Sequence, residues 1–286
     1  MAQVIMIDRS VIRIVQTPSP VSALWRAAIA SACQERGWVY TEFWGGEPPV
    51  LDETKRHVVL SWSVDDALPV SQWVLIACEP SEAISSLESQ HQLPVSDARY
   101  HASGRFAAMS MLAMKGAPVF QDSWAELDIP GLGRVELGSL PTKRVRDVSC
   151  PLSMYDSLPP AIGCTALWPP EIFSYDTPQY GDGEIALLGR RRLLFNGPNL
   201  SLCAGVWSVN AQIDIDPAPR AELLVEWGHG YETSKLEHAF TEPGRFEFLL
   251  RHEWNLAAPA DFRISLMLPA LDGRIAFRRL AVRREA

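Results

Sequence analysis

A strictly alternating segment at positions 207–216 constrains the fold more than any other feature of the sequence. Its odd-numbered positions are apolar and its even-numbered positions are polar, as Trp207, Ser208, Ile213 and Asp214 illustrate. Because side chains along a β-strand point alternately to opposite faces, this pattern predicts a strand with one buried face and one solvated face. Strands of this kind are typical of antiparallel sheets.

Similar patterns follow one another through the C-terminal part of the chain. Turn sequences such as Asp216-Pro217 and Glu242-Pro243-Gly244 separate them. In the last segment the apolar positions change phase at Arg278-Arg279, which predicts a β-bulge. We expect an antiparallel, jelly-roll-like β-sandwich over residues 165–286. Its strands are expected at 185–188, 193–195, 207–216, 221–227, 245–254, 262–268 and 275–282.

The N-terminal part mixes apolar strands with helical patterns. Ser19 precedes Pro20 at the expected start of a helix, as an N-cap would, and Gly37 provides its end. Near-continuous apolar runs predict strands that are covered on both faces. We expect a Rossmann-like three-layer α/β domain over residues 1–127. Its strands are expected at 11–15, 38–44, 58–64, 73–78 and 118–120, and its helices at 21–36, 82–90 and 98–115.

Residues 128–164 differ from both halves. This segment is dense in Gly, Pro and Ser and has no helical periodicity, but it keeps apolar residues. We interpret it as a connector that packs against its neighbours. The predicted architecture is therefore α+β, with two domains and a packed connector between them.

Composition restricts the function classes. The net charge of −8 argues against nucleic-acid partners. No apolar run approaches the roughly 18 residues of a membrane span. The five cysteines form no C-x-x-C pair, and the six histidines show no metal-ligand spacing, although His229, His238 and His252 could converge in a sandwich. We therefore predict no metal and no cofactor, a cytoplasmic location, and either a monomer or a homo-oligomer.

Polar residues follow the predicted α/β strands. Ser19 follows the first strand, Asp65 and Asp66 follow the third, and Glu79 follows the fourth. Ligands of open α/β sheets bind at this carboxyl edge, so these residues form one candidate site. The first strand-helix turn has no glycine, and Walker A and G-x-S-x-G motifs are absent from the sequence. Capping or solvation of these side chains is the alternative interpretation.

Aromatic residues in turns of the predicted sandwich form a second candidate site. Exposed rings stack on the C–H faces of sugars, while neighbouring polar side chains bond to hydroxyl groups. Trp227 and Trp254 fall at the alternate positions of their strands that are expected to face the core, so burial in the core is the other interpretation of these two residues. The candidate ligand-binding residues are Trp227, His229, Tyr231, Trp254 and Asn255.

Two sequence stretches carry a family resemblance. The run GPNLSLCAGVWSV and the ending FRISLMLPALDGRIAFRRLAV resemble the core turn and the closing strand pair of jelly-roll carbohydrate-binding modules. In that pattern Asn199 stands where an aromatic residue is usual, and Trp207 holds the second aromatic position. The resemblance covers residues 165–284 and implies that the last strand returns beside the first. Modules of this type are often attached to bacterial polysaccharide-biosynthesis proteins.

These observations lead to three functional hypotheses. The first is a non-catalytic glycan-binding or docking protein associated with bacterial surface-polysaccharide synthesis. The second is a glycosyltransferase-like or sugar-nucleotide-processing enzyme, because the α/β half resembles one half of a glycosyltransferase. The third is a structural protein whose sandwich mediates oligomerisation. We prefer the first, since the sequence contains no catalytic motif.

Overall fold

The computed structural model describes residues 11–45, 47–62, 64, 72–138, 147–176 and 183–286. The chain forms two compact units, and we describe each by itself. The α/β unit comprises Met1–Gln92 and Ala108–Arg146, and the sandwich unit comprises Leu93–Ala107 and Asp147–Ala286. The division falls within helix α3 (Val95–Met114). None of the described helices combines the length and the apolar character that a membrane crossing requires.

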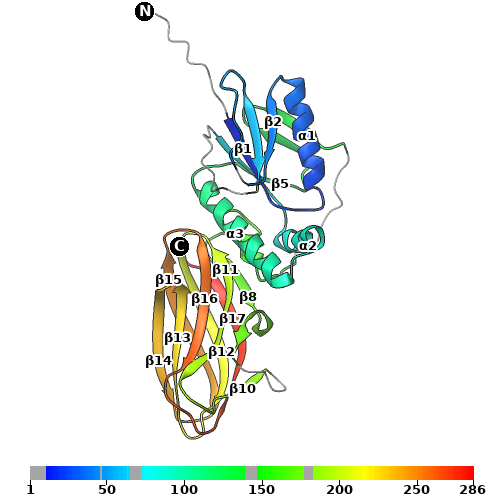
Figure 1. Cartoon of the computed structure of the whole chain (residues 1–286). Coiled ribbons are helices and arrows are strands. Elements are labelled where there is room, and N and C mark those ends of the chain that lie inside the picture. The colour runs from blue at the N-terminus through cyan, green and yellow to red at the C-terminus, as the bar shows by residue number, and fades with distance from the viewer. Residues whose placement is uncertain (1–10, 46, 63, 65–71, 139–146, 177–182) are drawn as a thin grey trace, which may run out of the picture. The chain divides into compact units, whose positions relative to one another are not determined.

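The α/β unit is built on a five-stranded parallel sheet with the order β2-β3-β1-β4-β5 (Figure 1). The Rossmann fold has the order 3-2-1-4-5, so β2 and β3 are exchanged here. The parallel sheet agrees with the expected α/β class, but its strand order differs from that of a Rossmann fold. Its strands are β1 (Val11–Gln16), β2 (Val39–Phe43), β3 (His57–Ser61), β4 (Gln72–Ala77) and β5 (Val119–Gln121).

Helix α1 (Ser22–Glu35) covers one face of this sheet, and α2 (Pro80–His91) follows β4. Ser19 is not the N-cap of α1, because the helix starts later, with Val21 in the N-cap position. The Ser22 hydroxyl instead donates a hydrogen bond of 2.6 Å to the carbonyl oxygen of Ser19. This turn buries Ser19 rather than exposing it as a helix cap.

The predicted connector begins as part of the α/β unit. Strands β6 (Glu126–Ile129) and β7 (Gly133–Glu136) form a hairpin. Their apolar side chains, including Leu127 and Val135, share a core cluster with Trp25 of α1. The α/β unit therefore continues past residue 127 through the β6–β7 hairpin, because the apolar residues of this hairpin are buried against α1.

The sandwich unit consists of two antiparallel sheets, with the orders β10-β17-β12-β15 and β14-β13-β16-β11-β9. Strand β8 also pairs with β17, so the last strand returns beside the first, as the jelly-roll resemblance implied. The β-sandwich prediction is confirmed. The strands are β8 (Thr165–Trp168), β9 (Ser174–Tyr175), β10 (Glu184–Ala186), β11 (Arg192–Leu202), β12 (Gly205–Asp216), β13 (Ala221–His229), β14 (Glu232–Phe240), β15 (Gly244–Trp254), β16 (Ala258–Leu266) and β17 (Arg274–Arg284).

Strand β12 lies in the middle of its sheet and shows the predicted alternation. Trp207, Val209, Ala211, Ile213 and Ile215 are buried. The register between β12 and β17 shifts between residues 212 and 213, which confirms the bulge predicted from the phase change. The sequence did not predict β14, an edge strand whose side chains are mostly exposed on both faces.

Candidate functional site

Two of the aromatic candidates belong to the core. Trp227 is 0% and Trp254 is 1% exposed, and their rings lie 5.1 Å apart. The Trp227 indole N–H donates a hydrogen bond of 3.3 Å to the carbonyl oxygen of Trp207. In both strands the side chains that face the core alternate with the others up to the last residues, so both rings point inward. Neither ring therefore offers a face to a ligand. We therefore remove both tryptophans from the candidate site.

The remaining aromatic-loop candidates lie near the end of the β13–β14 hairpin. Tyr231 is fully exposed, His229 is half-buried, and Asn255 is exposed after β15. The rings of His229 and His252 are 5.6 Å apart, and both contact Trp254. The pKa of His252 is lowered by burial and by the neighbouring His229. Of the aromatic rings named here, Tyr231 is the exposed one.

Two of the α/β candidates, Ser19 and Glu79, follow strands β1 and β4 at the carboxyl edge of the parallel sheet. The chain continues from β1 to β2 on one side of the sheet and from β4 to β5 on the other side. The direction of the connections therefore reverses between β1 and β4, and ligands of open α/β folds bind at such a point. Ser19 follows β1 and is buried, and its hydroxyl oxygen has no hydrogen-bond partner within the described part of the chain. Glu79 is the N-cap residue of α2. Asp65 and Asp66 lie outside the described residues.

A further cluster at this edge was missed by sequence reasoning. Cys78, Glu82 and Asp122 bring one ligand atom each within 4.8 Å of one another. The Thr17 hydroxyl contacts Cys78 twice. Its oxygen accepts a hydrogen bond of 2.8 Å from the Cys78 backbone N–H and lies 3.2 Å from Cys78 Sγ. The Cys78 thiol also donates to the carbonyl oxygen of Pro18 at 3.4 Å. A carboxylate-rich edge repels phosphate, so an anionic nucleotide would need a bridging cation here.

The sandwich unit contains a groove that combines an exposed aromatic ring with hydroxyl-bonding side chains. Its volume is about 450 Å³. Tyr100 of α3 is 46% exposed, and Asp97 lies one helical turn before it. Opposite α3 lies the Gly197-Pro198-Asn199 segment of β11, in which Asn199 adopts a left-handed conformation with φ of 60°. The groove is lined by Ser96, Asp97, Tyr100, Ile172, Ser174, Gly197, Pro198, Asn199 and Pro259.

Buried polar contacts fix the β11 wall of this groove. The backbone N–H of Gly197 donates to Asp261 Oδ1 at 3.0 Å, and Arg263 pairs with the other carboxylate oxygen at 2.5 Å. Burial raises the pKa of Asp261, while Arg263 opposes the shift. A charge that is buried but paired holds the segment in one conformation.

A second set of contacts fixes the α3 wall. The Ser103 hydroxyl accepts the backbone N–H of Ser201 at 2.9 Å, and Tyr155 donates to the Ser201 carbonyl oxygen at 2.8 Å. The ring of Tyr155 stacks on Phe106 at 5.6 Å. Both walls are therefore preformed, which lowers the entropy that a ligand would have to overcome.

Little in the amino-acid sequence indicated this groove. Its lining comes from four separate segments, and the expected helix began at residue 98, so Asp97 fell outside it. The Gly197-Pro198-Asn199 run was interpreted only as a fold marker. The one available signal was the spacing of Asp97 and Tyr100, which places both on one face of a helix.

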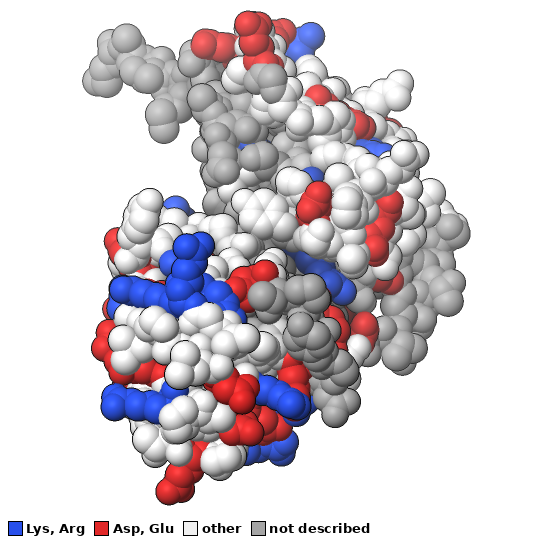
Figure 2. Space-filling model, turned by 60° about the horizontal axis from the view of Figure 1, so that its bottom comes forward, with Lys and Arg blue, Asp and Glu red and all other residues white. Residues whose placement is uncertain are grey.

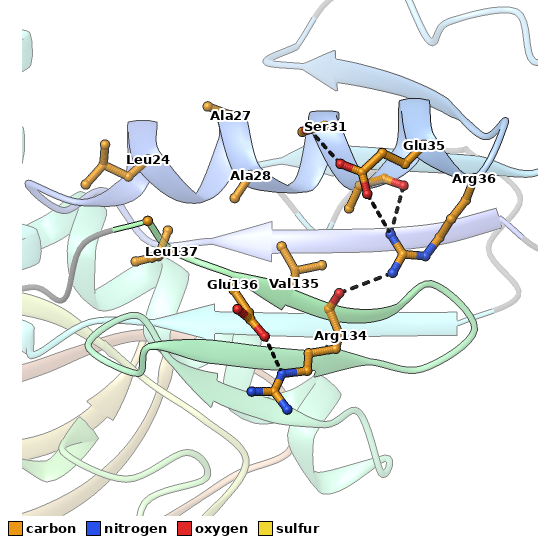
Figure 3. A pocket seen from close by; sticks show the side chains of 12 residues that line it. Leu24, Ala27, Ala28, Ser31, Glu35, Arg36, Arg134, Val135, Glu136 and Leu137 are labelled. Carbon is orange, nitrogen blue, oxygen red and sulfur yellow. Dashed lines mark hydrogen bonds and ion pairs between the residues drawn. The ribbon is translucent and has the colours of Figure 1, made fainter.

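A larger groove of about 710 Å³ lies in the α/β unit between α1 and β7 (Figure 3). Short apolar side chains such as Ala28 and Val135 form its floor. The charged side chains at one end pair with one another, since Arg134 lies 2.7 Å from Glu136 and Arg36 lies 3.9 Å from Glu35. Its lining has no aromatic ring, and its paired charges leave few groups to recognise a polar ligand.

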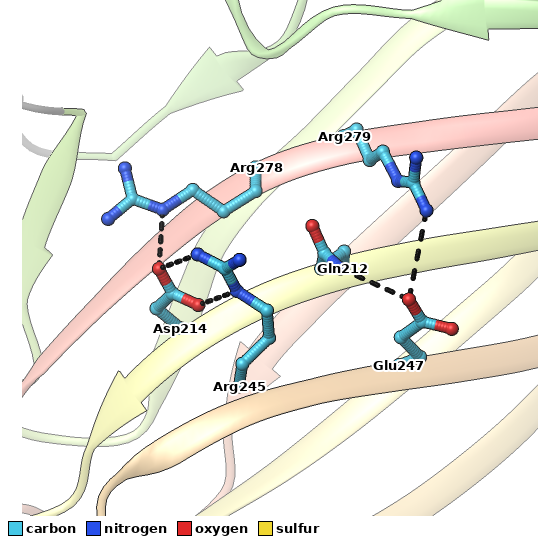
Figure 4. A network of polar contacts seen from close by, with 6 residues as sticks. All are labelled: Gln212, Asp214, Arg245, Glu247, Arg278 and Arg279. Carbon is cyan, nitrogen blue, oxygen red and sulfur yellow. Dashed lines mark hydrogen bonds and ion pairs between the residues drawn. The ribbon is translucent and has the colours of Figure 1, made fainter.

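The polar face of β12 forms an ion-pair network (Figure 4). Asp214 lies between Arg245 of β15 and Arg278 of β17, at 2.6 Å and 2.7 Å. Hydrogen bonds from Arg245 are the main reason that the pKa of Asp214 falls from 3.8 to about 2. Basic and acidic side chains of the described residues are interspersed over the face shown in Figure 2. The network neutralises Asp214 and stabilises the sheet.

Comparisons with known proteins give no family assignment. No protein-family model matches the chain, and no curated protein matches it. Among solved structures, TmCBM61 in complex with β-1,4-galactotriose matches with a TM-score of 0.28 and 11% identity, over 36% of this chain and 69% of that chain. The CBM22-1 xylan-binding domain from Paenibacillus barcinonensis Xyn10C matches with a TM-score of 0.27 and 10% identity, over 43% and 96%.

Murine APRIL matches with a TM-score of 0.23 and 10% identity, over 36% of this chain and 76% of that chain. At such low TM-scores these likenesses carry no argument about ligand or activity. The architecture described above rests on the strand pairing of the chain itself.

Proposed function

We propose that the sandwich unit binds a saccharide without catalysis, in the groove between Tyr100 and Asn199. The observation that carries this proposal is an exposed Tyr100 ring beside Asp97 and Asn199 in a preformed groove of about 450 Å³. A tyrosine ring stacks on the C–H face of a sugar, and carboxylate and amide groups bond to its hydroxyls. The resemblance of the sequence to carbohydrate-binding modules supports the same ligand class.

Two matched variants distinguish saccharide binding in the groove from binding at Tyr231 in the β13–β14 hairpin, which the sequence predicted. A glycan array with the full chain identifies the ligand, and titration calorimetry then measures affinity. Tyr100→Ala should weaken binding about tenfold or more, because the stacking ring is lost, whereas Tyr231→Ala should leave affinity unchanged. Asp97→Asn should weaken binding several-fold. Loss of binding in Tyr231→Ala alone would place the site at the hairpin, and no saccharide binding by the parent chain would refute the proposal.

The association with bacterial surface-polysaccharide synthesis and the cytoplasmic location are parts of this proposal that rest on the sequence alone. Cell fractionation tests the location directly. Recovery of the protein outside the cytoplasm would contradict the proposed location.

A second candidate function is the processing of a sugar nucleotide by the α/β unit. The observation that favours it is the reversal of strand connection between β1 and β4, beside the buried Ser19 hydroxyl. UDP- or GDP-sugars with Mg²⁺ should then raise the melting temperature, because a ligand that binds only the native state stabilises it. An unchanged melting temperature at millimolar ligand would remove this candidate.

A further inference from the structure

Two histidines and one glutamate meet at the open edge of the sandwich. His229 ends β13, Glu232 begins β14, and His252 lies near the end of β15. One ligand atom from each lies within 4.8 Å of the other two. Strand β14 is the edge of one sheet and β15 the edge of the other, so the three side chains join the two sheets.

The Nε2 atoms of both histidines are buried and lack hydrogen-bond partners among the described residues. Solvent does not reach His229 Nε2 or His252 Nε2. Glu232 Oε2 lies 3.7 Å from His229 Nε2, which is too long for a hydrogen bond. Buried polar atoms are nearly always bonded to protein, water or an ion, so these two atoms require an explanation.

Ser234 fixes the orientation of one of these rings. Its hydroxyl donates to the carbonyl oxygen of Arg251 at 2.6 Å and lies 3.3 Å from His252 Nδ1. Because that hydroxyl has used its proton, it accepts the Nδ1–H of His252, and the ring then carries its free lone pair on Nε2. Metal-bound histidines are oriented in this way by a bond from their second ring nitrogen.

We propose that His229, Glu232 and His252 bind a divalent transition-metal ion of the Zn²⁺ type. Two imidazoles and one carboxylate match the ligand preference of Zn²⁺, whereas Ca²⁺ and Mg²⁺ prefer oxygen ligands alone. Three protein ligands leave one position of a tetrahedral site for water. The ion connects the β13–β14 hairpin to β15 and supplies a partner to both buried nitrogens. The sequence alone predicted no metal, because the ligands lie on three different strands.

Zn²⁺ titration of the EDTA-treated full chain tests this proposal by calorimetry. One Zn²⁺ should bind per chain, and His229→Gln and His252→Gln should each weaken binding at least 100-fold. Ser234→Ala should weaken it about 10- to 100-fold, because the ring orientation is lost. The matched control is His238→Gln, which removes an exposed histidine from the same edge strand and should leave the affinity unchanged.

A spectroscopic measurement on the parent chain keeps the test independent of variant folding. Co²⁺ should give the intense visible absorption of a tetrahedral site, and Zn²⁺ should displace it. Zn²⁺ should raise the melting temperature, while Ca²⁺ at the same concentration should not. Failure of the parent chain to bind Zn²⁺, or unchanged binding in the His229→Gln, His252→Gln double variant, would overturn the proposal.

Discussion

The parallel sheet and the sandwich place their polar side chains in different positions. Strand β3 is buried at every position, and the polar groups of the α/β unit gather where strands end, as Thr17 and Asp122 do. In the sandwich, polar side chains cover the outer face of β12, exemplified by Asp214, and the edge strand β14. A polar site built on the parallel sheet is therefore expected at the strand ends. In the sandwich it can form at an edge or beside a turn.

The largest expected effect is the loss of stability when a core tryptophan is removed, and it should be similar in the two units. Trp25 and Trp227 are both 0% exposed, and each donates its indole N–H to a backbone carbonyl. Either tryptophan-to-alanine substitution should lower the free energy of unfolding of its unit by about 3–5 kcal/mol, because a large cavity remains. Urea denaturation followed by circular dichroism measures this. A loss below about 1 kcal/mol at one site would show that its unit has a looser core.

Thr17→Val tests the strand-end polar groups of the α/β unit. Valine keeps the shape of threonine, but the backbone N–H of Cys78 would lose the acceptor that now lies 2.8 Å away. The free energy of unfolding should fall by about 1–3 kcal/mol, because a buried donor loses its bond. Thr17→Ser, which keeps the hydroxyl, is the control and should recover most of that loss in the same urea experiment.

Asp214→Asn tests the outer face of the sandwich and should have a smaller effect. We expect a loss of about 1 kcal/mol at pH 7, since the carboxylate is partly exposed and screened by solvent. The pKa of Asp214 falls from 3.8 to about 2 on folding, so its stabilisation is complete above pH 4 and disappears as the pH falls towards 2. Parent and variant should therefore converge in stability over this range, and added salt should also reduce their difference.

Gly104→Ala should give the smallest effect, with the opposite sign. Gly104 lies inside α3, and an added Cβ would lie 3.8 Å from Ser201 Oγ, an ordinary contact distance. Alanine should stabilise the sandwich unit by about 0.5–1 kcal/mol, because glycine loses more backbone entropy on folding. A lower melting temperature of the variant would instead show that α3 needs glycine to approach β11.

Local patterns could be predicted from the sequence because they need only neighbouring residues. The alternation in β12 fixed its buried face, and the phase change at Arg278 located the bulge that brings this side chain to Asp214. Strand β14 gave no such signal, because both of its faces are largely exposed and therefore polar. The β6–β7 hairpin was hidden by its glycine-rich turn, although Leu127 and Ile129 already alternate with acidic residues.

Neither candidate site could be assembled from sequence spacing. The groove joins Asp97, Asn199 and Pro259, which are far apart in the chain and meet only through tertiary packing. The same holds for His229 and His252, which come from two different sheets. Sequence reasoning did select His229 and Tyr231, but it could not show which nearby aromatic rings are covered.

The polar edge strand β14 also bears on self-association. An edge strand presents unpaired backbone groups to which a strand of another molecule can add. Here Lys235, Glu237 and His238 are exposed along that edge, and Lys235 pairs with Glu226 at 3.1 Å. Extending the sheet through β14 would bring the charged side chains of Lys235 and Glu237 from two chains together. Charged side chains on an edge strand disfavour such edge-to-edge pairing, so the strand that the sequence pattern failed to reveal has the features that limit it.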